Sequence, residues 1–233
     1  MSASRAESIA RGLADVRARI DAARSAAGRE DDVALIVVTK TFPASDVRIL
    51  ADLGVTEVAE NRDQEASAKR EDAGPVDLRW HMIGQLQRNK ARSVVAWADV
   101  VETVDRTALV AALGRAAVEA GRTVEVLIQV SLDLAPRADR GGADPEQVLA
   151  LADGIAAEPA LVLRGVMGVA PFPGDPDQAF ARLARVSAAL RERWPLADRI
   201  SAGMSGDLEQ AVLHGATQVR VGGAVLGQRA TVQ

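Results

Sequence analysis

The chain has 233 residues, of which 48% are hydrophobic, and its net charge is -4 at pH 7. This length suits one large domain or two small ones, and the scattered basic residues argue against nucleic acid as a main partner. The absence of cysteine and the presence of only two histidines exclude disulfides, thiolate nucleophiles and histidine-rich metal sites. A carboxylate site is not excluded by this composition, but we expect no metal.

No apolar run approaches the roughly 20 residues that a membrane-spanning helix needs. Residues 1–11 are polar and lack the apolar segment of a secretory signal. We therefore expect a soluble, cytoplasmic protein without membrane contact.

Apolar spacing and turn residues predict alternating helices and strands along the whole chain. In chain order the first elements are a helix to Gly28, a strand over 33–40, a helix over 45–54, a strand over 57–59, a polar helix over 61–71, a strand over 78–83, a helix over 86–96 and a strand over 99–103. The later elements are a helix from Asp105 to Gly121, a strand over 124–130, a helix over 144–157, a strand over 161–167, a helix over 175–194, a strand over 199–201, a helix over 206–214, a strand over 217–221 and a terminal helical turn.

Three helix starts carry specific capping signals. Asp105 is expected to cap the helix that follows it. Asp144 and Asp175 each precede a proline, which suits the first helical position, and the residues after it complete a capping pattern.

Eight strands, each followed by a helix, predict an α/β fold with a parallel sheet covered by helices. Eight such units in about 200 residues fit a small (β/α)8 TIM-type barrel with an extra N-terminal helix. A doubly wound open sheet is the alternative, but it needs fewer strands, and no Gly-x-Gly-x-x-Gly turn follows the first strand. We see no linker, so we expect residues 1–233 to form one barrel domain, with residues 1–28 as a helix packed on it.

Lys40 is the first candidate for chemistry, because only three of the 28 basic residues are lysines and this one ends an apolar run. A lysine amine, unlike an arginine, can lose a proton and condense with an aldehyde. Parallel α/β folds place their chemistry at the carboxyl ends of the strands. The alternative is a strand-end lysine that reaches solvent. Lys69 and Lys90 lie on polar helix faces and are expected to be solvated.

Two segments near the C-terminus suggest a phosphate site. Residues 201–206 offer two hydroxyls and flexible backbone after strand seven, and Gly222 and Gly223 offer bare amides at a helix start after strand eight. A lysine across the rim from such a site suggests a phosphorylated aldehyde, for which pyridoxal 5'-phosphate (PLP) is the best fit. Arg220 would then face the pyridine nitrogen.

Other readings of these polar residues stay open at this stage. Arg220 could instead be a barrel-interior arginine paired with a carboxylate. His81 could be a hydrogen-bonded strand histidine, and His214 a partner of a helix C-terminus.

Five stretches together carry a more specific resemblance. They are Val37-Val38-Thr39-Lys40-Thr41; Glu60-Asn61 with Gln64-Glu65-Ala66; Trp80-His81-Met82-Ile83-Gly84 with Leu86-Gln87-Arg88-Asn89-Lys90; Gly203-Met204-Ser205-Gly206-Asp207-Leu208-Glu209; and Val219-Arg220-Val221-Gly222. With these the chain resembles the pyridoxal-phosphate homeostasis protein family, relatives of the N-terminal barrel of alanine racemases.

The resemblance implies a PLP-binding barrel without a well-established reaction, in which Lys40 forms the Schiff base and Arg220 faces the pyridine nitrogen. The implied phosphate positions are Ser201, Ser205, Gly222 and Gly223; Asn61 and His81 match the ring pocket, and Gly203 and Met204 belong to the same cofactor-binding set. The chain departs from the family at three positions: Arg62 replaces the usual tyrosine, Met82 the usual aromatic residue and Gly223 the usual threonine.

Two functional classes follow from these residues. The first is a carrier or buffer that holds PLP on Lys40 and hands it to apo forms of PLP-dependent enzymes; we expect such a protein to be a monomer. The second is a weak PLP-dependent amino-acid racemase or lyase with Lys40 as its base, although the chain contains no tyrosine to act as a second acid. A barrel aldolase acting on a sugar phosphate is a third reading.

Overall fold

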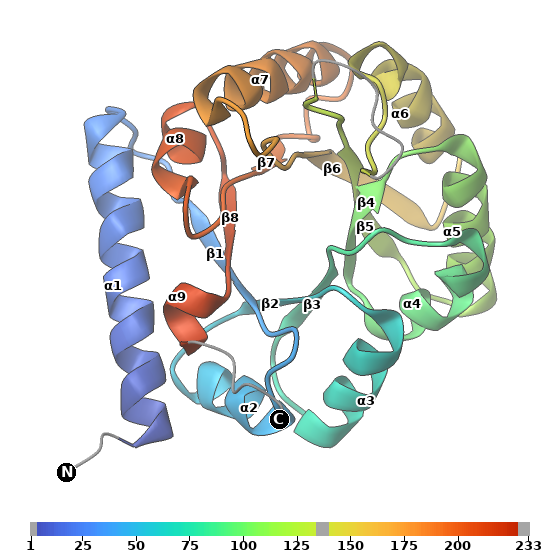
Figure 1. The fold of residues 1–233 in the computed structure, drawn as a ribbon. Coiled ribbons are helices and arrows are strands. Elements are labelled where there is room, and N and C mark those ends of the chain that lie inside the picture. Colours follow the sequence, from blue (N-terminus) through green and yellow to red (C-terminus); the bar gives the residue numbers. More distant parts are fainter. Residues whose placement is uncertain (1–3, 134–139, 228–233) are drawn as a thin grey trace.

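The computed structural model describes residues 4–133 and 140–227. Eight parallel strands form a closed barrel in the order β1 to β8, and helices surround it on the outside (Figure 1). The barrel closes where β1 pairs with β8, with Ile36 opposite Arg220. The predicted TIM-type barrel with an additional N-terminal helix is therefore confirmed.

The strands are short and the helices are of unequal length. The strands are β1 Ala34–Val38, β2 Glu57–Glu60, β3 Arg79–Met82, β4 Val100–Val104, β5 Val124–Gln129, β6 Leu161–Met167, β7 Arg199–Ser201 and β8 Gln218–Val221. The α-helices are α1 Arg5–Ala26, α2 Ala44–Asp52, α3 Asp63–Ala73, α4 Ala91–Trp97, α5 Thr107–Glu119, α6 Val148–Ala156, α7 Pro176–Arg193, α8 Leu208–Leu213 and α9 Gly223–Leu226, and 3-10 turns lie at Arg88–Lys90 and Pro145–Gln147.

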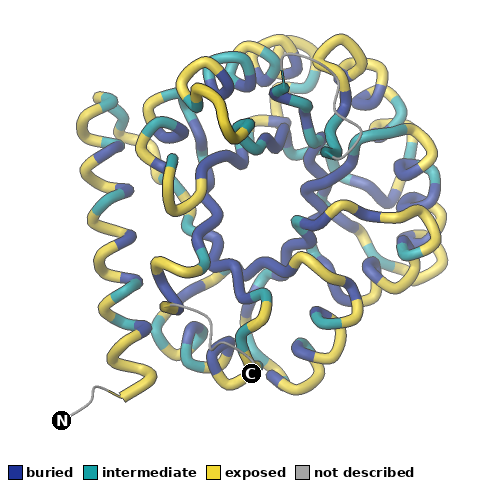
Figure 2. The backbone as a smooth tube through the Cα atoms, in the orientation of Figure 1, coloured by how far each residue is buried: buried dark blue, intermediate teal, exposed yellow. Residues whose placement is uncertain are grey.

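The two faces of the barrel wall differ in character. Side chains alternate along a strand, so one face packs against the helices and the other fills the barrel. The outward face belongs to one large apolar core shared with the helices. Among the described residues, the inward face holds two small apolar clusters, one around Ile36, Val38 and Ala59 and one around Val100, Leu127 and Met167. Figure 2 shows the buried strands as a dark ring inside helices that expose their outer sides.

Charged side chains fill part of the barrel. Glu125 lies among three arginines, with Arg79 Nη2, Arg164 Nη2 and Arg199 Nη1 at 2.5, 2.8 and 2.9 Å from its carboxylate oxygens. Burial alone would raise the pKa of Glu125, but its bonds with the arginines outweigh this effect and lower the pKa. Arg79, Glu125 and Arg199 lie at or next to the starts of their strands, so the cluster lies toward the amino ends of the strands.

Helix α1 flanks the barrel beside α8 and α9 (Figure 1). Ser4 and Glu7 form a reciprocal capping box at its start. Its buried residues Ile9, Leu13, Val16 and Ile20 recur at helical spacing and join the outer core. The predicted N-terminal helix is therefore present and packs on the barrel through this face.

Several element starts differ from the sequence-based prediction. Asp105 does not cap α5, because that helix begins at Thr107 after an N-cap at Arg106. The helices predicted from 86 and from 144 each open with a 3-10 turn before the α-helix. Asp175 does cap α7, where its carboxylate accepts bonds from the amides of Asp177 and Gln178.

Within residues 4–133 and 140–227, no helix combines the length and the apolar character needed to cross a membrane.

Candidate functional site

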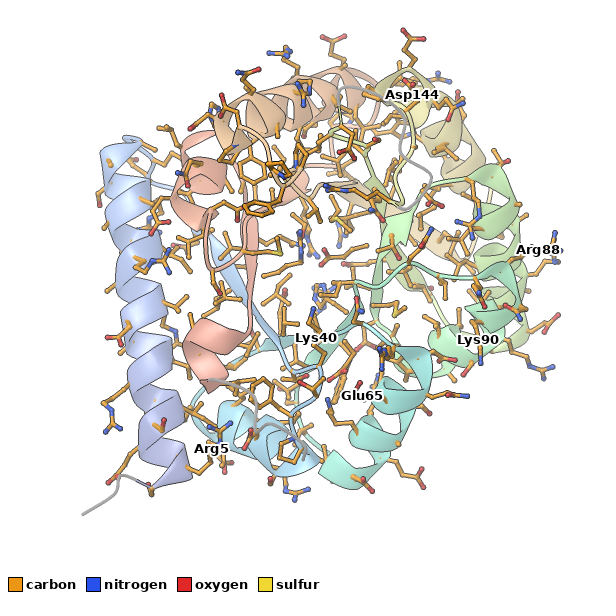
Figure 3. All side chains as sticks on the ribbon, in the orientation of Figure 1. Arg5, Lys40, Glu65, Arg88, Lys90 and Asp144 are labelled. Atoms are coloured by element: carbon orange, nitrogen blue, oxygen red, sulfur yellow. The ribbon has the colours of Figure 1, made fainter. Side chains whose placement is uncertain are left out.

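Lys40 lies just beyond β1, on the turn that follows the strand. The strand ends at Val38, two residues earlier than predicted, and Lys40 is half-buried. The next residue, Thr41, has a φ of 69°, in the left-handed region that a β-branched residue rarely adopts. Figure 3 places Lys40 inside the ring of helices, with Glu65 of α3 close by. The turn thus holds Lys40 at the carboxyl-end rim.

Lys40 lines a cavity of about 290 Å³ between the ends of β1 and β8. Because β8 is the neighbour of β1, the turns after these two strands meet here. Six predicted site residues line this cavity: Lys40, Met204, Ser205, Arg220, Gly222 and Gly223. The structure thus brings together, in one hollow, residues from three distant stretches of sequence.

Glycine forms one end of the cavity. A side-chain carbon added at Gly222 would lie 2.9 Å from the carbonyl oxygen of Val38, so this residue has to approach β1 closely. At Gly206, Gly223 and Gly227 an added carbon would meet nothing within 4 Å. All four glycines line the cavity, so this end of it consists of backbone without side chains and has open space next to it. Gly203 does not line the cavity; it has a φ of 91°, and a side-chain carbon added there would lie 2.7 Å from Cβ of Ala211.

Arg220 lines the cavity and is almost fully buried. Its Nη1 donates to Ser201 Oγ at 2.5 Å, and its Nη2 donates to the carbonyl of Gly168 at 3.0 Å. Glu102 Oε2 lies 3.8 Å from Nη1. Burial lowers the pKa of Arg220, and the charge of Glu102 opposes that effect. Arg220 thus lines the cavity and also has a carboxylate nearby, while its contact with a pyridine nitrogen stays a prediction.

Ser201 lies behind Arg220. Its side chain is fully buried, and its hydroxyl donates to Glu102 Oε2 at 2.6 Å while it accepts the bond from Arg220. The resemblance implied a phosphate contact for Ser201. In the structure this hydroxyl instead bonds to Glu102 and Arg220, and so helps to orient the Arg220 guanidinium.

His81 lies inside the barrel between two carboxylates and does not line the cavity. Its Nδ1 is 2.7 Å from Glu102 Oε1, and its Nε2 is 3.2 Å from Glu57 Oε2. Burial alone would lower the pKa of His81, but the two carboxylates outweigh it and raise the pKa above 6.5. Burial would likewise raise the pKa of Glu102, yet its bond with His81 lowers it. His81 therefore supports Glu102 and, through it, Arg220.

We predict that His81 remains protonated above its ordinary pKa of 6.5. Because the folded-state pKa is raised, the stabilisation from this charge is complete below 6.5 and is lost as the pH rises through the folded value. An NMR titration of the imidazole resonances, with His214→Gln to assign the two histidines, measures this directly. A His81 resonance that titrates at or below 6.5 would contradict the prediction.

Asn61 and Lys90 line a different hollow on the same rim. This cavity, of about 580 Å³, lies between the ends of β2 and β3 and also contacts Arg62 and Met82. Asn61 is exposed there, and its backbone carbonyl lies so close to Gly84 that a side-chain carbon at Gly84 would be 2.0 Å from the oxygen. The structure therefore does not bring Asn61 into the cavity of Lys40.

The prediction that Lys69 is solvated is wrong. Its side chain is only 6% exposed, and its Nζ lies 2.5 Å from Glu60 Oε1 and 3.2 Å from Glu65 Oε1. Lys90 is 40% exposed and its Nζ is 3.8 Å from Asp63 Oδ2, in keeping with the prediction that it is solvated.

Sequence reasoning also missed Glu102, although a lone carboxylate in the apolar run of β4 was a signal of an internal partner. His214 ends α8 as expected, with its Nε2 3.0 Å from Asp177 Oδ1.

Comparison with known proteins places these observations in a family. Residues 12–230 match the alanine racemase N-terminal domain family. A pyridoxal phosphate homeostasis protein of Mycobacterium tuberculosis (strain H37Rv) is 44% identical over 93% of this chain and 91% of its own length.

Two solved structures are similar in fold and in sequence. A protein from Bifidobacterium adolescentis has a TM-score of 0.88 and 32% identity, with 97% of each chain covered. PipY of Synechococcus elongatus PCC7942, in its structure with PLP bound, has a TM-score of 0.81 and 34% identity over 94% of this chain and all of its own. With its barrel, its rim lysine and these matches over nearly its whole length, the chain belongs to the pyridoxal phosphate homeostasis protein family, within the alanine racemase N-terminal domain family.

Proposed function

We propose that the protein binds PLP in the cavity of Lys40, holds it as a Schiff base on that lysine, and takes part in PLP homeostasis as a carrier or buffer. One observation carries this proposal: a lysine, a buried arginine and a glycine-lined end share one cavity of about 290 Å³. The names of the relatives and the PLP-bound structure of PipY support it.

The residues present fit a phosphorylated aldehyde. Gly222, Gly223 and Ser205 offer backbone and a hydroxyl for the phosphate, next to open space that a side chain at Gly223 would fill. Met204 lines the same end. We leave Ser201 out of the phosphate contacts, because Arg220 and Glu102 already engage its hydroxyl.

PLP supplies an aldehyde and an electron-accepting ring. Lys40 would be the residue that holds this group, because its amine can condense with an aldehyde and release water. Arg220 would face the ring nitrogen as a hydrogen-bond donor and would keep its proton, because an arginine does not act as an acid in proteins. An unprotonated ring nitrogen withdraws electrons weakly, so this arrangement disfavours aminotransferase-type chemistry.

Carriage is preferred over racemisation because the chain contains no tyrosine that could act as a second acid. Delivery predicts that the loaded protein activates an apo-aminotransferase faster than an equal amount of free PLP does. Exchange of Cα protons of amino acids with deuterated solvent would instead reveal Lys40 acting as a base.

We predict that Lys40→Ala abolishes covalent capture of PLP. The measurement is the visible absorption of purified protein with added PLP, followed by borohydride reduction and mass analysis of the labelled peptide. Lys90→Ala is the matched control, because Lys90 is an exposed lysine on the same rim and its loss should leave the band intact. No band in the wild-type protein, or an unchanged band in Lys40→Ala, would overturn the proposal.

A further inference from the structure

A buried ionic cluster braces the turn that carries Lys40. It consists of Lys69 and Glu65 of α3 and Glu60 at the end of β2, and we call it the Lys69 clamp. All three act on Thr39 or Thr41, the two residues that flank Lys40. No residue of the clamp lines the cavity of Lys40.

The clamp fixes the turn on the side before Lys40. Lys69 Nζ donates to the carbonyl oxygen of Thr39 at 2.7 Å, and the Thr39 hydroxyl donates to Glu60 Oε1 at 2.6 Å. Thr39 and Glu60 are fully buried, so these bonds form away from water, where they are strong and where their loss is costly. The backbone that leads into Lys40 is thereby held at two points.

The clamp also fixes the side after Lys40. The amide of Thr41 donates to Glu65 Oε1, the oxygen that also faces Lys69 Nζ. Thr41 holds a left-handed conformation that is unfavourable for threonine and persists only where surrounding contacts enforce it. Glu65 supplies such a contact, and Lys69, four residues later on α3, orients Glu65.

The charges of the cluster depend on Lys69. Burial raises the pKa of Glu60, and the bonds from Lys69 and Thr39 offset this only in part. Burial would also raise the pKa of Glu65, but its bonds with the Thr41 amide and Lys69 outweigh this and lower it. Lys69 is the only cation in contact with both carboxylates in the described part of the chain. Its removal leaves the buried Glu60 and the partly buried Glu65 without their shared cation.

We propose that Lys69 is a positioning residue that holds the Thr39–Thr41 turn so that the Lys40 amine is aimed at an incoming aldehyde. This inference rests on the proposed function. It also explains why two lysines close in the fold differ in role, since both carboxylates and a carbonyl engage the Lys69 amine.

The test separates covalent capture from binding. In Lys69→Met we expect capture of PLP by Lys40 to slow about 10- to 100-fold, the range that a small misplacement of a reacting group produces. Pyridoxamine 5'-phosphate lacks the aldehyde and should bind Lys69→Met as it binds wild type, because the cavity keeps its lining. Lys69→Arg, which keeps the charge, should restore part of the rate. Lys90→Met is the control and should change neither readout.

A readout without cofactor tests the clamp by itself. Hydrogen exchange of the Thr41 and Phe42 amides in the free protein should accelerate in Lys69→Met, since Thr41 bonds to Glu65 and Phe42 bonds to the Thr39 carbonyl. If Lys69→Met does not fold, Lys69→Met/Glu60→Gln removes one cation and one anion together, and the same slow capture is expected of it.

Wild-type capture rates in the folded variant would overturn the inference. An equal loss of capture and of pyridoxamine 5'-phosphate binding would do so as well, because it would mean general damage to the cavity. A wild-type protein that captures no PLP would overturn the proposed function instead, while the exchange measurement would still decide whether the clamp holds the turn.

Discussion

Replacement of Glu102 by leucine is expected to lower the free energy of unfolding by about 3–5 kcal/mol, the usual cost of leaving buried charges without their partner. Glu102 is fully buried and faces His81 at 2.7 Å, Ser201 at 2.6 Å and Arg220 at 3.8 Å. It also accepts a bond from Gln218 at 3.2 Å. Leucine would leave two cations and two hydrogen-bond donors facing an apolar side chain.

Urea unfolding of wild type and variant at neutral pH measures this loss. Glu102→Gln keeps the shape and some hydrogen bonding and should lose less than Glu102→Leu. The double variant Glu102→Leu/His81→Leu should recover part of the loss, because it also removes a buried cation. A Glu102→Leu protein within about 0.5 kcal/mol of wild type, the range of ordinary surface changes, would show that the network contributes little.

The Glu102 network also bears on the cofactor site. Arg220 is the residue that we expect at the pyridine nitrogen, and Ser201 and Glu102 fix its guanidinium from behind. His81 and Glu57 extend this support further into the barrel. His81, which the resemblance assigned to the ring pocket, thus contacts the residues that support Arg220 and does not line the cavity itself.

The barrel could be predicted from the sequence because its outward strand faces are apolar and recur between helical segments. Val37, Val58 and Val219 lie in the shared outer core, and such residues make each strand visible. The gathering of Lys40, Arg220 and Gly222 follows from the same pattern, since closure of a barrel makes the first and last strands neighbours.

The interior network could not be predicted, because its partners are far apart in the chain. Glu102 bonds to Ser201, 99 residues later, and to Gln218, 116 residues later. The sequence around Glu102 gives no indication of which distant residues it will contact. Lys69 was misjudged for a related reason: the surrounding sequence of α3 is polar, and the burial of Lys69 comes from Glu60 and Thr39, which lie on other elements.

Gly84→Ala is expected to destabilise the protein by about 3 kcal/mol, at the upper end of the cost of overpacking. An added carbon at Gly84 would lie 2.0 Å from the backbone carbonyl oxygen of Asn61 and 3.0 Å from its Oδ1. The carbonyl of Gly84 also accepts the hydroxyl of Thr103 at 2.8 Å. Gly84 is therefore held between the ends of β2 and β4, and relief of the overlap has to move Asn61 and the rim.

Gly154→Ala is the matched control for Gly84→Ala. Gly154 lies in α6, where an added carbon meets nothing within 4 Å. Alanine at this partly buried helical position should stabilise by about 0.5–1 kcal/mol, so the two variants should differ in sign. Urea unfolding gives both values, and PLP capture by Gly84→Ala reports whether displacement of Asn61 reaches the cavity of Lys40. Equal stability of the two variants would mean that the segments after β2 and β3 can move apart with little loss of folding free energy. The close contact between Gly84 and Asn61 would then not fix the structure of the rim.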